Sequence, residues 1–241
     1  QRLLKQIHFD LEFIDFSNDT KPEDKALQWL NHCFQQPFSF HKNNLLWHFS
    51  LIKESESRYY LMTKYHHLIA DGWSTTVVIA RLAEIYNAFL NKQPIKQKSP
   101  HRYFDFIKQE QEYLRSSSYK IDHRYWEKTL PTTPEPLISR RYALSSKTLL
   151  PKANSYQITL SRSLLNSIDQ LSSTNKSTRY QTILSSLAIY FSRIYQRKEI
   201  IIGVPSLNRK GARFKDTFGM FISLSPLVIN IEKTENSSQI I

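Results

Sequence analysis

Cysteine is almost absent from this chain of 241 residues, in which Cys33 is the single thiol. One cysteine excludes an intrachain disulfide framework and a metal site built from several thiolates, and it fits the reducing cytoplasm. The sequence also lacks an apolar run long enough to span a bilayer, and it lacks the pattern of a signal peptide. We therefore expect a cytoplasmic protein with no membrane partner.

Glycine is scarce as well, with four positions: Gly72, Gly203, Gly211 and Gly219. Each lies where a strand-like segment and a loop are predicted to meet. Because glycine is used where the backbone turns sharply or another group approaches closely, these junctions are candidate functional segments. No GxSxG sequence is present, which argues against a serine hydrolase.

Acidic residues are outnumbered, since 21 Asp and Glu stand against 33 Lys and Arg, and the formal net charge is +12. A charge of this size makes nucleic acid a partner to consider. The basic residues are dispersed, however, and no nucleic-acid-binding motif accompanies the basic segments 92–98, 193–198 and 208–215. We interpret them as solvated surface and expect no nucleic acid partner. An acidic protein partner would suit the charge equally well.

Strand and helix patterns both occur, which predicts an α/β or α+β fold. Strand-like segments are expected over residues 5–16, 45–54, 58–67, 155–161, 199–205 and 223–231. Helical spacing of apolar residues is expected over 22–35, 75–91, 161–171 and 180–195. The sequence PTTPEP (131–136) is typical of a connection between lobes. We therefore divide the chain into an N-terminal lobe, 1–135, and a C-terminal lobe, 136–241.

The segment KYHHLIADGWS (64–74) concentrates residues that carry chemistry. On a regular strand, successive side chains point to opposite faces, so His66 and His67 are not expected to serve one site. One should face a pocket while the other packs or forms hydrogen bonds within the fold. The HHxxxD spacing matches neither of the usual two-histidine metal spacings, so no metal is expected.

A helix is predicted to begin at Ser74, a residue suited to the N-cap position. The turn before it then lies at the positive end of a helix, which favours the neutral form of a histidine that accepts protons. Asp71 could fix this turn or meet a distant cation. The alternative to a functional site is a purely structural role for this segment. Lone histidines usually form their hydrogen bonds within the fold or at its surface, and Asp-Gly-x-Ser is a common sequence for a turn and a helix cap.

The stretch His66 to Gly72 resembles the HHxxxDG signature of the condensation domains of nonribosomal peptide synthetases, which belong to the chloramphenicol acetyltransferase-like superfamily. Further segments are similar to the other motifs of that family, and they follow in the family's order. They are YFDF (103–106), Tyr125-Trp126, IGVP (202–205) with Arg209, and FGMF (218–221) with Leu227 and Ile229.

The sequence departs from the family pattern at three of these places: Gln109 replaces a Trp, Ser223 replaces an Asn, and Val228 replaces an Arg. In that family the position of Ser223 lies on the acceptor side of a substrate tunnel, so this replacement bears on how the acceptor substrate is bound. Four outer motifs of the family have no counterpart, and we therefore expect a chain truncated at both ends.

The resemblance implies a two-lobed fold with a tunnel between the lobes. It implies His67 as the catalytic residue in that tunnel, supported by His66, Asp71, Gly72 and Trp73, with Arg209 bonded to Asp71. Donor and acceptor peptidyl carrier proteins would deliver thioesters on phosphopantetheine arms, next to an adenylation domain in the parent chain, and the domain itself would bind no cofactor. His67 would act as a base or position the amine.

Two alternatives stay open at this point. A stand-alone acyltransferase of the same superfamily would use a small-molecule or coenzyme A substrate and would need no carrier protein. A non-catalytic platform for carrier recruitment is the alternative of another class. Such platforms often lose the second histidine, whereas His67 is present here.

Overall fold

The computed structural model describes residues 7, 9–41, 44–96, 101–138, 155–209 and 212–231. The chain forms two compact units, each built from separated stretches of sequence. The first unit comprises Gln1–Glu112 with Leu207–Ile222, and the second comprises Tyr113–Ser206 with Ser223–Ile241. The segment carrying Arg209 therefore belongs to the same unit as Asp71. A lobe boundary near residue 135 stays a prediction.

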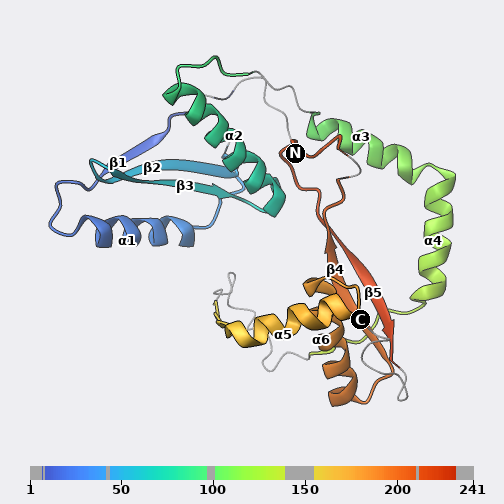
Figure 1. Ribbon diagram of the computed structural model, residues 1–241. Helices are drawn as coiled ribbons and strands as arrows, with labels where there is room; N and C mark the ends of the chain where they lie inside the picture. Colours follow the sequence, from blue (N-terminus) through green and yellow to red (C-terminus); the bar gives the residue numbers. More distant parts are fainter. Residues whose placement is uncertain are drawn as a thin grey trace. The chain divides into compact units, whose positions relative to one another are not determined.

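The first unit is built on a three-stranded sheet in the order β1-β2-β3 (Figure 1). Strand β1 pairs parallel to β2, and β2 pairs antiparallel to β3. Helix α1 packs on the sheet through a small core of Ala26, Ile52 and Met62, all of which are buried. The elements are β1 (Glu12–Asp15), α1 (Pro22–Gln35), β2 (Trp47–Ser55) and β3 (Arg58–Tyr65).

The first unit also contains helix α2 (Gly72–Leu90) and all but the last two residues of helix α3 (Tyr103–Leu114). Helix α3 contributes Phe106 to a second core, where it meets Phe214 and Phe221. These two residues belong to Leu207–Ile222, the returning segment, which comes back to the first unit from far along the chain. This aromatic core fastens Leu207–Ile222 to the first unit, because burying three aromatic rings removes a large apolar area from water.

The described residues of the second unit form a two-stranded antiparallel sheet and three helices. Helix α6 packs on the sheet through Ala188, which is buried with Ile200 and Ile231. Helix α6 begins with a capping box in which the Thr178 hydroxyl and the Gln181 side chain each satisfy a backbone N–H. The elements are α4 (Ser117–Thr129), α5 (Arg162–Thr174), α6 (Arg179–Tyr195), β4 (Glu199–Ser206) and β5 (Ser223–Asn230).

Most of the predicted elements are confirmed, with three differences. Residues 155–161 are not a strand, because no described segment pairs with them and extended backbone needs a partner to form a ladder. Strand β1 covers only Glu12–Asp15 of the expected 5–16, part of which lies outside the described residues. Helices α3 and α4 were not expected.

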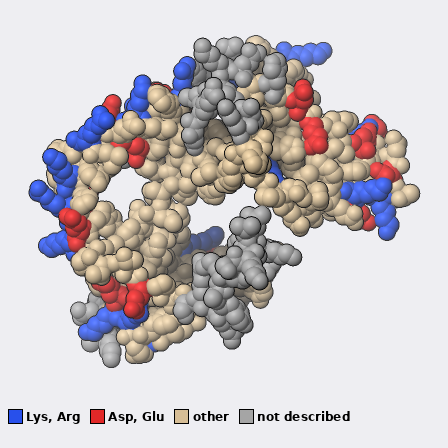
Figure 2. All heavy atoms as spheres, turned by 180° about the vertical axis from the view of Figure 1, so that it is seen from behind, with Lys and Arg blue, Asp and Glu red and all other residues tan. Residues whose placement is uncertain are grey.

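The described helices include none that is long and apolar enough to cross a membrane. On the face of the molecule seen in Figure 2, lysine and arginine side chains lie singly or in small groups beside acidic ones. The dispersed charge expected from the sequence is visible on this face.

Candidate active site

The two histidines lie in a turn at the end of β3. The strand ends at Tyr65, two residues earlier than the sequence predicted. The His66 N–H donates to the Leu46 carbonyl at 2.8 Å, and the His66 carbonyl accepts from Ile69 N–H at 3.0 Å. The strand alternation expected for the two side chains therefore does not apply, and the turn decides where each ring points.

His66 is held within the fold on several sides. Its Nδ1 accepts from the Leu68 N–H at 3.0 Å, which places the ring proton on Nε2. The rings of Phe38 and Phe40 meet the imidazole edge-on, with centroids 5.9 and 5.0 Å away. His66 is half-buried, whereas its neighbour His67 is exposed and has no hydrogen bond to any described residue. His67 is thus the histidine available to a substrate.

Asp71 is the N-cap residue of α2, and its Oδ1 accepts from the Ser74 N–H at 2.9 Å. The expectation that Ser74 caps this helix was wrong, because the helix begins at Gly72. Asp71 is only 3% exposed. A buried carboxylate is costly unless its charge and lone pairs are satisfied, so its remaining contacts matter more than the cap alone.

The predicted contact between Asp71 and Arg209 is confirmed. Arg209 Nη2 lies 2.9 Å from Oδ1 and 3.2 Å from Oδ2, and both side chains are almost fully buried. A guanidinium can hold a carboxylate with two parallel bonds, one from each of two nitrogens, but here Nη2 alone contacts both oxygens. Nη1 instead donates to the carbonyls of Phe214 and Thr217, at 2.8 and 2.5 Å. Arg209 thus joins the carboxylate to the loop that follows it in sequence.

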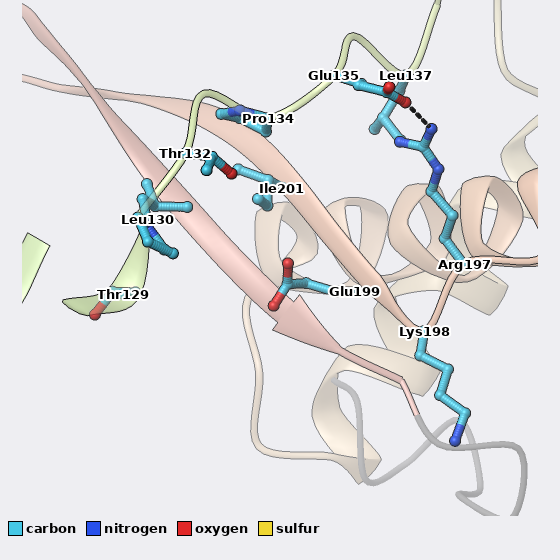
Figure 3. A pocket seen from close by; sticks show the side chains of 11 residues that line it. Thr129, Leu130, Thr132, Pro134, Glu135, Leu137, Arg197, Lys198, Glu199 and Ile201 are labelled. Atoms are coloured by element: carbon cyan, nitrogen blue, oxygen red, sulfur yellow. Dashed lines mark hydrogen bonds and ion pairs between the residues drawn. The ribbon is translucent and has the colours of Figure 1, made fainter. Parts of the chain in front are cut away.

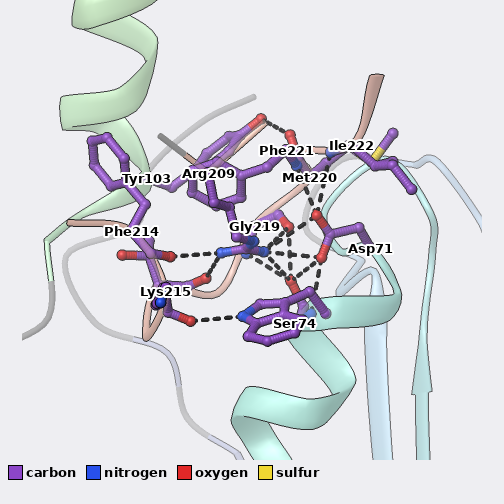
Figure 4. A network of polar contacts seen from close by, with 12 residues as sticks. Asp71, Ser74, Tyr103, Arg209, Phe214, Lys215, Gly219, Met220, Phe221 and Ile222 are labelled. Carbon is purple, nitrogen blue, oxygen red and sulfur yellow. Dashed lines mark hydrogen bonds and ion pairs between the residues drawn. The ribbon is translucent and has the colours of Figure 1, made fainter. Parts of the chain in front are cut away.

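The second oxygen of Asp71 binds backbone amides of the returning segment (Figure 4). Oδ2 accepts from the N–H groups of Phe221 at 3.0 Å and Ile222 at 3.3 Å. Burial raises the pKa of the Asp71 carboxyl, but hydrogen bonds from Phe221, Ser74 and Arg209 outweigh it and leave the pKa below its ordinary value.

The lowered pKa of Asp71 predicts a specific loss of stability in acid. A carboxyl whose pKa is lower in the folded state stabilises the fold above its unfolded pKa of about 3.9 and loses that contribution as the pH falls through the folded pKa. The difference in free energy of unfolding between the unaltered protein and Asp71→Asn should therefore narrow below about pH 4. Urea unfolding at several pH values measures it. A difference that stays constant to about pH 3 would contradict the prediction.

Ser74 is a second centre of this network, and sequence reasoning assigned it only a capping role. Its side chain is fully buried. The hydroxyl lies 2.7 Å from the Gly219 carbonyl and 2.9 Å from Asp71 Oδ1, and it accepts from the Gly219 N–H at 3.0 Å. Trp73 adds a further link, since its indole N–H donates to the Lys215 carbonyl at 2.8 Å. The first turn of α2 is thereby tied to the segment 215–219.

Gly219 is a glycine because an aromatic ring lies against its backbone. An added Cβ would lie 2.3 Å from the Tyr103 ring, whereas at Gly72 and Gly203 it would meet nothing within 4 Å. The ring has little room to move, because its hydroxyl donates to the Met220 carbonyl at 2.6 Å and the ring forms a T-shaped contact with Phe221, with centroids 5.1 Å apart. Of the four glycines, Gly211 lies outside the described residues.

Replacing Gly219 with alanine should therefore destabilise the protein. Forcing an extra methyl into a well-packed site typically costs about 1–3 kcal/mol, and the lost Tyr103 hydrogen bond would add to this. Gly203→Ala is the matched control, because its Cβ would enter open space and should change stability little. The midpoint of thermal unfolding measures both. Equal midpoints for the two variants would contradict the packing argument.

Ser223 begins β5 in the second unit and is exposed. Within the described part of the chain, no group of three or more His, Cys, Asp or Glu side chains is placed to hold a metal ion.

A separate hollow of about 490 Å³ lies in the second unit, between the segment after α4 and β4 (Figure 3). It contains an ion pair in which Arg197 Nη2 donates to Glu135 at 2.8 Å. None of the histidine-motif residues lines it. The lining residues are Thr129–Thr132, Pro134, Glu135, Leu137, Arg197–Glu199 and Ile201.

These elements form an α/β protein in which a buried Asp71–Arg209 pair lies next to the turn that carries the two histidines. A family model for the condensation domain matches residues 1–241, and the chain belongs to the condensation-domain family. The first condensation domain of the CDA synthetase covers 95% of the chain with a TM-score of 0.73 and 21% identity, and 51% of that structure is matched. The SgcC5 protein from Streptomyces globisporus gives a TM-score of 0.78, 20% identity and coverage of 99% and 54%. The α/β fold inferred from the resemblance is confirmed.

Curated relatives are much longer than this chain. One plipastatin synthase subunit from Bacillus subtilis (strain 168) is 29% identical over 93% of the chain, which spans 9% of that protein. Surfactin synthase subunit 1 from the same organism is 25% identical over 96% of the chain, which spans 6% of it. The chain therefore corresponds to a small part of the curated relatives that it matches.

Proposed function

We propose that this condensation domain forms an amide bond between a donor acyl or peptidyl thioester and the free amine of an acceptor aminoacyl thioester. The observation that carries the proposal is the pairing of a fixed His66 with an exposed His67, on a turn anchored by the buried Asp71–Arg209 pair. The chain matches 9% and 6% of two synthase subunits, which leaves room in such proteins for further domains and supports carrier proteins and an adenylation domain as partners. We further propose that the parent protein is cytoplasmic.

In the proposed reaction, the acceptor nitrogen attacks the donor carbonyl carbon and the C–N bond forms. The C–S bond then breaks, and the thiol of the donor phosphopantetheine arm leaves. The amine loses one proton, which His67 accepts and passes to the departing sulfur. The second role open to His67 is to orient the amine. An α-amine with a pKa of about 7.7–8.0 is partly neutral at cellular pH, so it does not require a strong base. In both roles, His67 must reach the reacting nitrogen.

A reconstituted reaction tests the proposed activity. The protein is incubated with a donor acyl thioester and an acceptor aminoacyl thioester, each loaded on a carrier protein, and the acceptor carrier is analysed by mass spectrometry. We expect the acceptor to gain the donor acyl group through an amide. Equal transfer from coenzyme A donors to free amines or alcohols would favour the stand-alone acyltransferase. Carrier binding without any transfer would favour the recruitment platform.

A further inference from the structure

Lys64 lies on β3, three residues before His67, and its ammonium group binds the end of another element. Lys64 Nζ donates to the Cys33 carbonyl at 2.6 Å and also to the Gln36 carbonyl. Both acceptors lie at the C-terminal end of α1, which ends at Gln35. The last carbonyls of a helix have no partner within the helix and carry partial negative charge, so an ammonium group suits them.

The same ammonium group also reaches the segment that follows α1. Lys64 Nζ lies 4.8 Å from the centroid of the Phe38 ring, within the range of a cation–π contact. Phe38 and Phe40 in turn meet the His66 ring edge-on. A continuous series of contacts therefore runs from Lys64 through Phe38 to His66.

Lys64 has no carboxylate partner among the described residues, so its contacts are limited to carbonyls and an aromatic face. Burial lowers the pKa of the Lys64 ammonium group, which shows that holding the charge here is costly. An apolar side chain at this position would pack without that cost. The contacts to α1 and Phe38 are therefore the advantage that a lysine brings.

We propose that Lys64 is a positioning residue for the histidine turn: it fixes the end of α1 and Phe38, and through them the ring of His66 and the placement of His67. The kinetic part of this proposal rests on the proposed amide-forming function. The structural part does not, since it concerns the His66 ring alone.

Lys64→Met keeps the length of the side chain and removes the charge and the hydrogen-bond donors. We expect kcat for amide formation to fall on the order of 10- to 100-fold, because a small misplacement of a reacting group has an effect of this size. The KM for the acceptor thioester should stay the same, since Lys64 acts through His66. Lys64→Arg, which keeps charge and donors, should recover part of the lost kcat.

Lys53→Met is the matched control, because Lys53 lies on the adjacent strand at the opposite end of the same sheet. Its ion pairs are with Asp15 and Glu56, far from the histidines in sequence and in register. This variant should keep the kcat of the unaltered protein. A loss equal to that of Lys64→Met would show a general effect on the sheet and overturn the proposal.

Nitrogen NMR of protein labelled with ¹⁵N-histidine gives a second readout that does not depend on activity. The His66 signal, assigned by its loss in His66→Gln, should show an unprotonated Nδ1 in the unaltered protein and in Lys53→Met. In Lys64→Met we expect exchange between tautomers. An unchanged His66 spectrum together with an unchanged kcat would overturn the proposal. If the unaltered protein forms no amide, the proposed function fails, and the spectrum alone decides the role of Lys64.

Discussion

Replacing His67 with alanine is expected to reduce amide formation by about 10²–10⁴-fold, the usual contribution of a positioned proton-transfer group. His67 is exposed and makes no hydrogen bond to a described residue, so its removal takes nothing from the fold. The thermal midpoint of the variant should equal that of the unaltered protein. The loss should appear in the dipeptide assay with loaded carriers, in kcat more than in KM.

His66→Ala provides the contrast, because His66 accepts the Leu68 N–H and packs against Phe38 and Phe40. Its removal should lower the thermal midpoint as well as the activity. If His67→Ala turns over at a rate near that of the unaltered protein, then His67 is not the catalytic residue. A fall in stability equal to that of His66→Ala would show instead that His67 holds the turn.

Removing Asp71 is expected to lower stability and activity together. Breaking a buried ion pair typically costs about 3–5 kcal/mol, because the remaining charge is left unpaired in a dry environment. Here Asp71→Ala would also leave the N–H groups of Phe221 and Ile222 without their carboxylate acceptor. The Ser74 N–H would lose the carboxylate and keep only its bond to the backbone carbonyl of residue 71. The turn that carries His67 directly precedes Asp71, so loss of this anchor should displace the histidine as well.

An exposed ion pair in the same chain serves as the control for Asp71. Asp169 pairs with Arg179 at the protein surface, and such pairs contribute about 0–1 kcal/mol. Asp169→Ala should therefore change the urea-unfolding midpoint little. If Asp71→Ala costs no more than about 1 kcal/mol, Asp71 acts only as a helix cap and the ion pair contributes nothing further.

Arg209→Lys separates charge from geometry in the same network. Lysine keeps the positive charge opposite Asp71 but cannot also bind the carbonyls of Phe214 and Thr217 with a second nitrogen. Nor does an ammonium group reproduce the planar stacking of the guanidinium, whose Cζ lies 3.8 Å from the centroid of the Phe221 ring. The variant should be less stable than the unaltered protein and more stable than Asp71→Ala. Urea unfolding of the three proteins measures this order.

Local sequence patterns determined the elements whose signal lies within a few residues. The apolar spacing and the proline in the first turn of α1 give that helix the bounds that were predicted, 22–35. Helices α2, α5 and α6 follow from the same periodicity. Strands β2 to β5 were predicted from their strand-like sequence, and in the structure each pairs with a neighbouring strand. The histidine motif and its order among the other motifs identified the family.

Other local signals were present but were given the wrong weight. No helix was predicted over α4, although Ser116 caps it by accepting from the Tyr119 N–H. The extended residues 155–161 looked like a strand, but composition alone does not supply a pairing partner. At the start of α2, both Asp71 and Ser74 were suitable caps, and the aspartate was the one used.

Only the tertiary structure decided how the site is held together. Asp71 meets Arg209 across 138 residues, a contact that resemblance predicted and that no local pattern contains. The roles of Ser74, Gly219 and Tyr103 were not foreseen, because each depends on a segment that returns from far along the chain to the first unit. The type of a residue limits what its side chain can bind, but it does not determine which partner the side chain meets. Here the packing of Phe106, Phe214 and Phe221 determines the partners, because it brings the returning segment against α2 and α3.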